Sequence, residues 1–286
     1  MRKEKIYQNK FINTLMLFDT KKVGSRQVRT GMGYEQEYKI DEDLYVFTSV
    51  PKNYEGKYTI DDFIFGVTTK RLLLFLIMKF TNLSEADREV GQIEFTVREF
   101  MELCNLKNSD NTKRLIEKDL FNLFCIRAEF QGQELFLLED IGIGRGKFVV
   151  ILHESFTSYM MAKKGIVLLP CQYFEIAINR SCEAPGWLYF LVCQSLINSR
   201  HTNKNRISVN SLLVRSSLMG INEIRQTSNC SVKERVITPL TKNLQAISES
   251  VEMKYFSKSG KELNERQLLN MGYDELIKVI IHFEIK

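Results

Sequence analysis

The clearest hydrophobic pattern begins at Thr69 and predicts two helices with a short strand between them. The stretch TKRLLLFLIMKFTN (69–82) is apolar almost all round, which is typical of a helix buried on several sides. QIEFTVREFMELCNL (92–106) predicts a short strand followed by a helix. Thr96 is placed to cap that helix, and Glu99, three residues later, completes a capping box.

The next elements add a third helix and a hairpin. NSDNTKRLIEKDLFNLF (108–124) carries apolar residues on one face and charged residues on another. CIRAEFQGQELFLLED (125–140) contains two strand-like runs that meet at Gln131 and Gly132, which indicates a hairpin turn. Helix, strand, helix, helix and hairpin is the order of a winged helix, which is a helix-turn-helix with a β wing.

The same order of elements recurs in the second half of the chain, without recognisable sequence identity to the first. APGWLYFLVCQSLINSR (184–200) predicts a helix with Pro185 near its first turn. RISVNSLLVRSSLMGI (206–221) predicts a short strand, a cap at Ser208 and a helix that ends near Gly220.

A basic helix and a wing complete the second set. SNCSVKERVITPLTKNLQAIS (228–248) predicts its third helix. VEMKYFSKSGKEL (251–263) predicts a strand that turns at Ser259 and Gly260, and IKVIIHFEIK (277–286) predicts the return strand. The insertion between these strands, at 262–276, predicts one short helix.

Pro239 interrupts the third helix of this second set. Projected at about 100° per residue, the apolar residues fall within one arc: Val232, Val236, Ile237, Leu240, Leu244 and Ile247. The polar residues fall on the opposite side: Glu234, Arg235, Thr238, Thr241, Lys242 and Gln245. A proline inside a helix costs about 3 kcal/mol, because it removes one backbone hydrogen bond. Two geometries lower that cost: a kink, or a break in which Thr238 caps a second helix that starts at Pro239.

Before residue 60 the pattern is weak. The beginning of the chain resembles a polar, basic arm, and EYKIDEDLYVFTSV (37–50) contains one or two strands. We therefore expect an α+β fold that is predominantly helical, with two tandem winged-helix domains and β-hairpin wings. The expected boundaries are an N-terminal arm over 1–64, a first winged helix over 65–165 and a second over 166–286.

The composition of this 286-residue chain is that of a soluble globular protein, with 44% hydrophobic and 26% charged residues. The longest apolar run, at 72–78, is far shorter than the roughly 20 residues of a membrane span. We read no signal peptide at the start. The six cysteines include no CxxC pair, so we expect a reduced, cytoplasmic protein. The three histidines lie far apart, so we expect no metal site and no cofactor.

Positive charge is concentrated in one region of the chain. The net charge is +5, yet residues 163–245 contain 11 Lys and Arg against 4 Asp and Glu. The remaining residues are slightly acidic. A basic face on such a protein is typical of proteins that bind a polyanion. The alternative is an ordinary solvated surface.

Two segments of the second set resemble the iteron-binding plasmid replication initiators. SVKERVITPLTKNLQAIS (231–248) is similar to a family segment in which a basic triplet precedes an apolar pair and a frequent proline. YFSKSGKE (255–262) with VIIHFEI (279–285) is similar to the family's wing. Two features depart from the family: Glu234 stands where the triplet is usually basic, and the insertion lengthens the wing.

The resemblance implies tandem winged helices over about 65–286 and a basic recognition helix in the major groove. It places Lys233 and Arg235 at the DNA-facing end, with Asn229 and Ser231 beside them. The other candidate DNA contacts are Arg225, Thr238 and Lys242, together with Lys254, Lys258 and Lys261 on the wing.

The resemblance also implies partners and an oligomeric equilibrium. The implied partners are double-stranded DNA with repeated origin sites, together with host initiator and helicase proteins. A homodimer in equilibrium with a monomer is implied, with the first winged helix serving dimerisation and accessory DNA contact. No membrane partner is expected.

Other functions compete with that of a non-enzymatic initiator. A tandem winged-helix transcription regulator without origin activity stays open as an alternative. A nuclease or primase needs clustered carboxylates around a metal, which the sequence does not contain. GIGRGK (142–147) superficially suggests a phosphate loop, but a strand follows it instead of a helix, so we expect a hairpin turn or loop.

Overall fold

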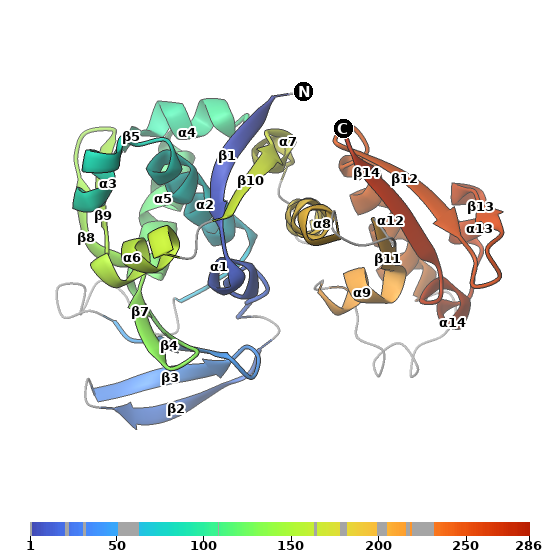
Figure 1. Ribbon diagram of the computed structural model, residues 1–286, viewed down its shortest axis with the longest axis horizontal. Coiled ribbons are helices and arrows are strands. Elements are labelled where there is room, and N and C mark those ends of the chain that lie inside the picture. Colours follow the sequence, from blue (N-terminus) through green and yellow to red (C-terminus); the bar gives the residue numbers. More distant parts are fainter. Residues whose placement is uncertain are drawn as a thin grey trace. The chain divides into compact units, whose positions relative to one another are not determined.

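The computed structural model describes residues 2–20, 23–30, 33–50, 63–107, 109–162, 165–177, 182–198, 205–215, 218 and 232–286. The chain divides into two compact units (Figure 1). The N-terminal unit is Glu4–Val167, and the C-terminal unit is Leu168–Lys286 together with Met1–Lys3. Each unit has its own helices and its own antiparallel sheet or sheets, and each is described separately below.

The N-terminal unit mixes short helices with strands. Its helices are α1 (Lys10–Leu15), α2 (Val67–Thr81), α3 (Glu85–Val90), α4 (Val97–Leu103), α5 (Ser109–Phe124) and α6 (Glu154–Ala162). Its strands are β2 (Ser25–Thr30), β3 (Gly33–Lys39), β4 (Leu44–Thr48), β5 (Gln92–Thr96), β6 (Ile126–Phe130), β7 (Gln133–Phe136), β8 (Leu138–Ile143) and β9 (Lys147–Leu152). The division between the units falls within β1 (Lys3–Gln8) and β10 (Gly165–Pro170).

Two antiparallel sheets organise this unit. One has the order β2-β3-β4-β6-β7 and the other has the order β5-β9-β8. The predicted hairpin at Gln131 and Gly132 is confirmed, with both residues at positive φ, 52° and 76°. The segment GIGRGK is the turn of the β8–β9 hairpin, closed by a hydrogen bond from Gly144 N to Lys147 O (2.9 Å). The hairpin expected there is therefore confirmed.

The described residues between 3 and 48 do not form the polar arm that the sequence suggested. Leu44 and Val46 of β4 are fully buried, and β4 pairs with β6 from Leu44–Phe130 to Thr48–Ile126. Phe11 of α1 is also fully buried. Most charged residues of these strands are exposed, such as Arg26 and Lys39, whereas Glu35 is buried, so the average composition hides a buried face.

The predicted helix–strand–helix–helix order is present, but the wing differs. Thr96 Oγ1 accepts a hydrogen bond from Glu99 N (3.1 Å) and Glu99 Oε2 accepts one from Thr96 N (2.6 Å), so the capping box is confirmed. The strand β5 pairs with β9 of the β8–β9 hairpin. The β6–β7 hairpin, expected to be the wing, instead joins β4 in the other sheet. A hairpin pattern depends on neighbouring residues, whereas the third strand with which the hairpin pairs depends on residues far away in the sequence.

The C-terminal unit contains the basic segment. Its helices are α7 (Gln172–Glu175), α8 (Ala184–Asn198), α9 (Val209–Val214), the π-helix η3 (Lys233–Ile237), α12 (Thr238–Ala246), α13 (Glu265–Leu269) and α14 (Tyr273–Leu276). Its strands are β11 (Arg206–Ser208), β12 (Val251–Phe256), β13 (Glu262–Leu263) and β14 (Ile280–Ile285). They form one antiparallel sheet with the order β11-β14-β12-β13.

Most predicted elements of this unit are present with changed bounds. Ser208 caps α9 as predicted, since its hydroxyl accepts a hydrogen bond from Ser211 N (3.1 Å). The expected helix end near Gly220 is wrong, because α9 ends with Val214 and Arg215 is its C-cap. The insertion holds two short helices, α13 and α14, instead of one. Asn264 begins α13 with a capping box, and Gly272 precedes α14.

The fold class is α+β with antiparallel sheets. A predominantly helical fold is not confirmed, because extended strands recur through both units. Across the described ranges, no helix has both the length and the apolar character needed to cross a lipid bilayer.

Candidate nucleic-acid interface

The helix that carries Pro239 passes through the proline without a break. Val232, Ile237 and Thr238 all have right-handed helical φ and ψ, and Thr238 N donates a hydrogen bond to Lys233 O, five residues earlier. This bond belongs to a π turn, in which one additional residue widens the helix. A proline ring normally clashes with the carbonyl four residues before it, and the wider turn relieves that clash.

Of the two geometries expected at Pro239, the break capped by Thr238 is therefore not the one that forms. Thr238 has helical backbone angles and makes no side-chain capping hydrogen bond. Pro239 does stand at the start of α12, as predicted, but η3 continues directly into it. The π turn belongs to the class of local distortions that bend helices.

The two faces of η3 and α12 agree with the predicted pattern, with one exception. All six predicted apolar residues are buried: Val232, Val236, Ile237, Leu240, Leu244 and Ile247. Lys233, Arg235 and Lys242 are exposed, and Thr238 is half-buried. The exception is Thr241, which is buried and donates its hydroxyl proton to Ile237 O (3.0 Å).

Asn243 anchors this helix to α8, a role that the pattern of residues did not predict. Its Oδ1 accepts hydrogen bonds from Glu183 N (2.8 Å) and Ala184 N (3.0 Å) at the start of α8. Its Nδ2 donates to Pro239 O (2.8 Å). In the sequence, the one signal was an amide between Lys242 and Leu244, next to the apolar positions of the helix. Because free N–H groups at a helix start need acceptors, this side chain fixes α12 against α8.

The wing turn presents two lysines on a closed loop. Ser257 N donates to Lys261 O (2.8 Å), and Gly260 N donates to Ser257 O (2.9 Å). Gly260 has φ of 83°, a conformation that strains any residue with a Cβ. Lys258 and Lys261 are exposed on this turn, and Lys254 is exposed on β12. The predicted turn at Ser259 and Gly260 is confirmed.

The insertion packs against the basic helix as well as extending the wing. The helix α13 contacts both η3 and α12, and Gln245 Nε2 donates a hydrogen bond to Glu265 Oε2 (3.1 Å). In the C-terminal unit, β13, α13 and α14 gather at one end of the paired strands β12 and β14 (Figure 1). The wing and the helix are therefore parts of one packed body.

The cations of this surface are not neutralised within the part of the chain that the structure describes. None of the following forms an ion pair with a described residue: Lys233, Arg235, Lys242, Lys254, Lys258 and Lys261. We call these six residues the free cations. Glu234 is exposed beside them and contributes the one negative charge of η3.

Three predicted contacts lie outside the described residues: Arg225, Asn229 and Ser231. Of the predicted site, η3 and α12 carry Lys233, Arg235, Thr238 and Lys242, and β12 with its turn carries the three wing lysines. Among the described residues, no three His, Cys, Asp or Glu side chains are grouped as a metal site.

Comparison with known proteins defines the fold. No protein-family model and no curated protein sequence matches the chain. Among solved structures, the chain is similar to the Pi initiator protein in complex with iteron DNA, with a TM-score of 0.50 and 11% identity. That similarity covers 100% of this chain and 99% of the other. The predicted resemblance to an iteron-binding initiator is confirmed at the level of the fold.

Two structures of RctB domains 2 and 3 are more weakly similar. Their TM-scores are 0.44 and 0.37, at 10% and 12% identity, and each match covers 92% of this chain and 91% of the other. The fold assignment rests on the similarity to the Pi initiator protein.

Proposed function

We propose that this chain, whose fold is similar to that of an iteron-bound initiator, is a sequence-specific double-stranded DNA-binding protein that initiates replication of a plasmid or related mobile element. The observation that carries the proposal is the set of six free cations on the basic helix and the wing. Cations that have no internal partner are available to replace the counterions of a nucleic-acid backbone. The protein acts in the cytoplasm and is not an enzyme.

The second winged helix provides the main DNA contact in this proposal. Its order of elements (α8, β11, α9, the η3–α12 helix and the β12–β14 wing) matches that of a helix-turn-helix with a wing. Lys233 and Arg235 stand near the start of the third helix, the part that meets base edges in the major groove. Lys242 and Arg225 contact phosphates, which position the protein without reading sequence.

The first winged helix has an accessory role. The elements α2, β5, α4, α5 and the β8–β9 hairpin follow the same order, with the wing at β8–β9. We assign this part to dimerisation and additional DNA contact. The dimer is in equilibrium with a monomer, and the DNA-bound protein helps load host initiator and helicase proteins at repeated origin sites.

Selection of bound sequences from random duplex DNA, followed by footprinting on the DNA of the plasmid or mobile element itself, tests this function. Tandem direct repeats are the expected result for an initiator. A single palindrome would favour a tandem winged-helix transcription regulator without origin activity. Metal-dependent cleavage or synthesis of DNA by the purified protein would contradict both.

A further inference from the structure

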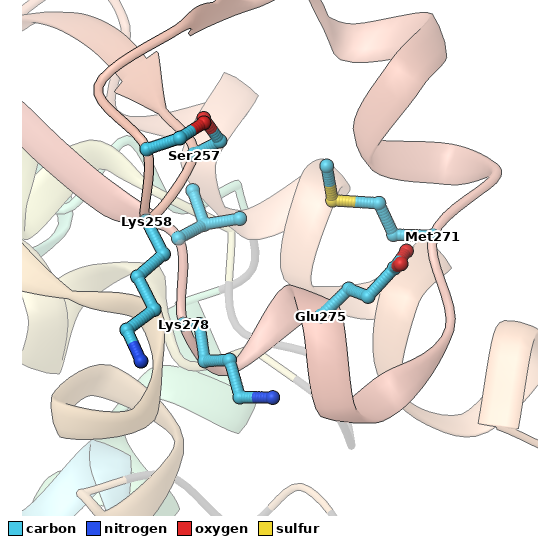
Figure 2. A pocket seen from close by; sticks show the side chains of 7 residues that line it. Ser257, Lys258, Met271, Glu275 and Lys278 are labelled. Carbon is cyan, nitrogen blue, oxygen red and sulfur yellow. The ribbon is translucent and has the colours of Figure 1, made fainter.

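A cavity of about 520 Å³ lies between the wing turn and the second helix of the insertion (Figure 2). The turn contributes Ser257, Lys258 and Ser259 to its lining. The segment that includes α14 and precedes β14 contributes Met271, Glu275, Lys278 and Val279. This volume is within the range of about 300–1,000 Å³ that is typical of small-ligand sites.

The lining contains two cations, one carboxylate and two apolar side chains. Figure 2 shows the Lys258 and Lys278 side chains extending in the same direction, while Glu275 and Met271 lie across from them. Both lysines and Glu275 are exposed, and none of the three forms an ion pair with a described residue. Two uncompensated cations on one side are suited to a phosphate group.

The turn side of the cavity is held in place by its own hydrogen bonds. Ser257 Oγ lies 2.9 Å from Ser259 Oγ and accepts a hydrogen bond from Lys261 N (3.1 Å). On the other side, Val279 N donates a hydrogen bond to Leu276 O (3.0 Å), and the Val279 side chain is buried. A preformed cavity loses less conformational entropy when it binds a ligand.

We propose that this cavity binds a nucleoside phosphate. Lys258 and Lys278 contact the phosphate, with the serine hydroxyls at the edge of the same site. Met271 offers an apolar surface to the base, and the Glu275 carboxylate accepts hydrogen bonds from sugar or base donors. The nucleotide is either free or part of a single strand, since both sources offer the same phosphate, sugar and base.

This site deepens the proposed function without depending on it. Lys258 is shared with the proposed DNA surface, whereas Glu275, Lys278 and Met271 are not among the proposed duplex contacts. Binding of nucleotide and binding of duplex DNA are therefore measured as separate properties.

The experiment titrates the full chain with a fluorescent adenosine diphosphate analogue, with inorganic phosphate and with a short single-stranded oligonucleotide. Lys278→Ala should weaken nucleotide binding about tenfold or more, because a hydrogen bond to a charged group is lost. Arg266→Ala is the matched control: it removes an exposed cation of α13 that does not line the cavity, and affinity should be unchanged. Glu275→Gln should weaken the nucleotide but not inorganic phosphate.

The outcomes distinguish a free nucleotide from a single strand, and the nucleotide site from the proposed duplex binding. Displacement of the fluorescent analogue by unlabelled nucleotide supports a free ligand, and saturable binding of the oligonucleotide alone supports a strand if Lys278→Ala weakens that binding and Arg266→Ala does not. Absence of saturable binding to both ligands overturns the site, as does equal loss in Arg266→Ala, or inorganic phosphate binding as tightly as nucleotide. Duplex affinity measured on the same proteins tests the proposed function separately: its absence beside intact nucleotide binding would remove only that function.

Discussion

The N-terminal unit and the C-terminal unit hold their basic side chains in opposite ways. In the N-terminal unit, many cations have a carboxylate partner: Lys10–Asp43, Arg26–Glu37, Lys79–Glu99, Arg98–Glu102, Lys113–Glu117, Arg127–Glu35, Arg127–Glu134 and Lys147–Glu94. In the C-terminal unit, the six free cations have no such partner among the described residues.

Under the proposed function, similar residue types serve different purposes in the two units. A cation paired with a carboxylate has its charge balanced locally, so it attracts a polyanion less. Breaking such a pair destabilises the fold mainly where the pair is buried. A cation without such a partner contributes little to folding, and its charge is not balanced locally. Substitutions in the buried ion pair of the N-terminal unit, Arg127 and Glu35, should therefore act on stability, and those among the free cations should act on DNA affinity.

The largest expected effect is the loss of duplex affinity with salt. If the six free cations each neutralise one phosphate, affinity should fall about a thousandfold between 50 and 200 mM salt. Titrations at several salt concentrations measure the slope, and Lys242→Gln should reduce it by about one. Arg26→Gln is the control from the N-terminal unit, where Arg26 Nε lies 2.7 Å from Glu37 Oε1, and the slope should stay the same. A flat salt dependence would contradict the role of the free cations.

Next in size is the loss of a buried ion pair in the N-terminal unit. Arg127 Nη2 lies 2.5 Å from Glu35 Oε2, and the two side chains are only 13% and 1% exposed. Arg127→Ala should lower the free energy of unfolding by about 3–5 kcal/mol, because it leaves the Glu35 carboxylate buried without its cation. Glu134→Ala removes the exposed partner of Arg127 and should cost at most about 1 kcal/mol. Chemical denaturation measures both. Equal costs would mean that burial does not distinguish the two pairs.

The third prediction concerns a buried acid. Burial raises the pKa of Asp119 to about 6, against the opposing effect of hydrogen bonds from the Thr69 and Thr68 hydroxyls. Between about pH 4 and pH 6 the folded protein keeps a proton on Asp119 that the unfolded chain has released. The contribution of Asp119 to stability is therefore greatest below about pH 4 and declines as the pH rises to about 6. The expected decline is on the order of 2–3 kcal/mol.

The Asp119→Asn substitution tests that assignment. The variant should lose this part of the pH dependence, whereas Asp110→Asn, at an exposed position in the first turn of α5, should retain it. Denaturation at a series of pH values between about 4 and 7 covers the window. An unchanged pH profile in Asp119→Asn would show that another group titrates there.

A smaller effect on DNA affinity should distinguish the roles of Arg235 and Lys242. Arg235→Ala should cost about 1–3 kcal/mol of binding and relax discrimination at one base position, if the guanidinium is bidentate to guanine. Lys242→Ala should weaken all duplex sequences about equally, because a phosphate contact carries no sequence information. Binding to a panel of single-base variants measures both. Indistinguishable profiles would show that these roles were wrongly assigned.

The smallest expected effect on stability is that of Pro239→Ala. Alanine supplies an N–H group and favours an α turn in place of the π turn, so we expect unchanged or slightly higher thermal stability. The change of turn would rotate Lys233 and Arg235 relative to the face anchored by Leu240 and Leu244, and specific DNA affinity should fall. Melting temperature and affinity are measured on the same preparation. A variant that binds its site as well as the parent would leave the proline with no role in aiming the helix.

The sequence alone determined the features that depend on neighbouring residues. The capping box of Thr96 and Glu99, the Ser208 cap and the turn at Gly260 were all predictable, because each involves hydrogen bonds or backbone angles within a few positions. The apolar face from Val232 to Ile247 follows from helical periodicity in the same way.

Only the tertiary structure decided which distant segments meet. Hairpin patterns did not reveal that β5 pairs with β9 while β6 pairs with β4, because the choice depends on burial against other segments. The course of the chain through Pro239 also depends on distant contacts. Local chemistry predicts that the proline disturbs the helix. The disturbance takes the form of a π turn because buried Val236 and Leu240, together with the contact of Asn243 with α8, hold the helix on both sides of it. Long-range contacts select among locally allowed backbones because burial and hydrogen bonds to distant groups outweigh small local differences in energy.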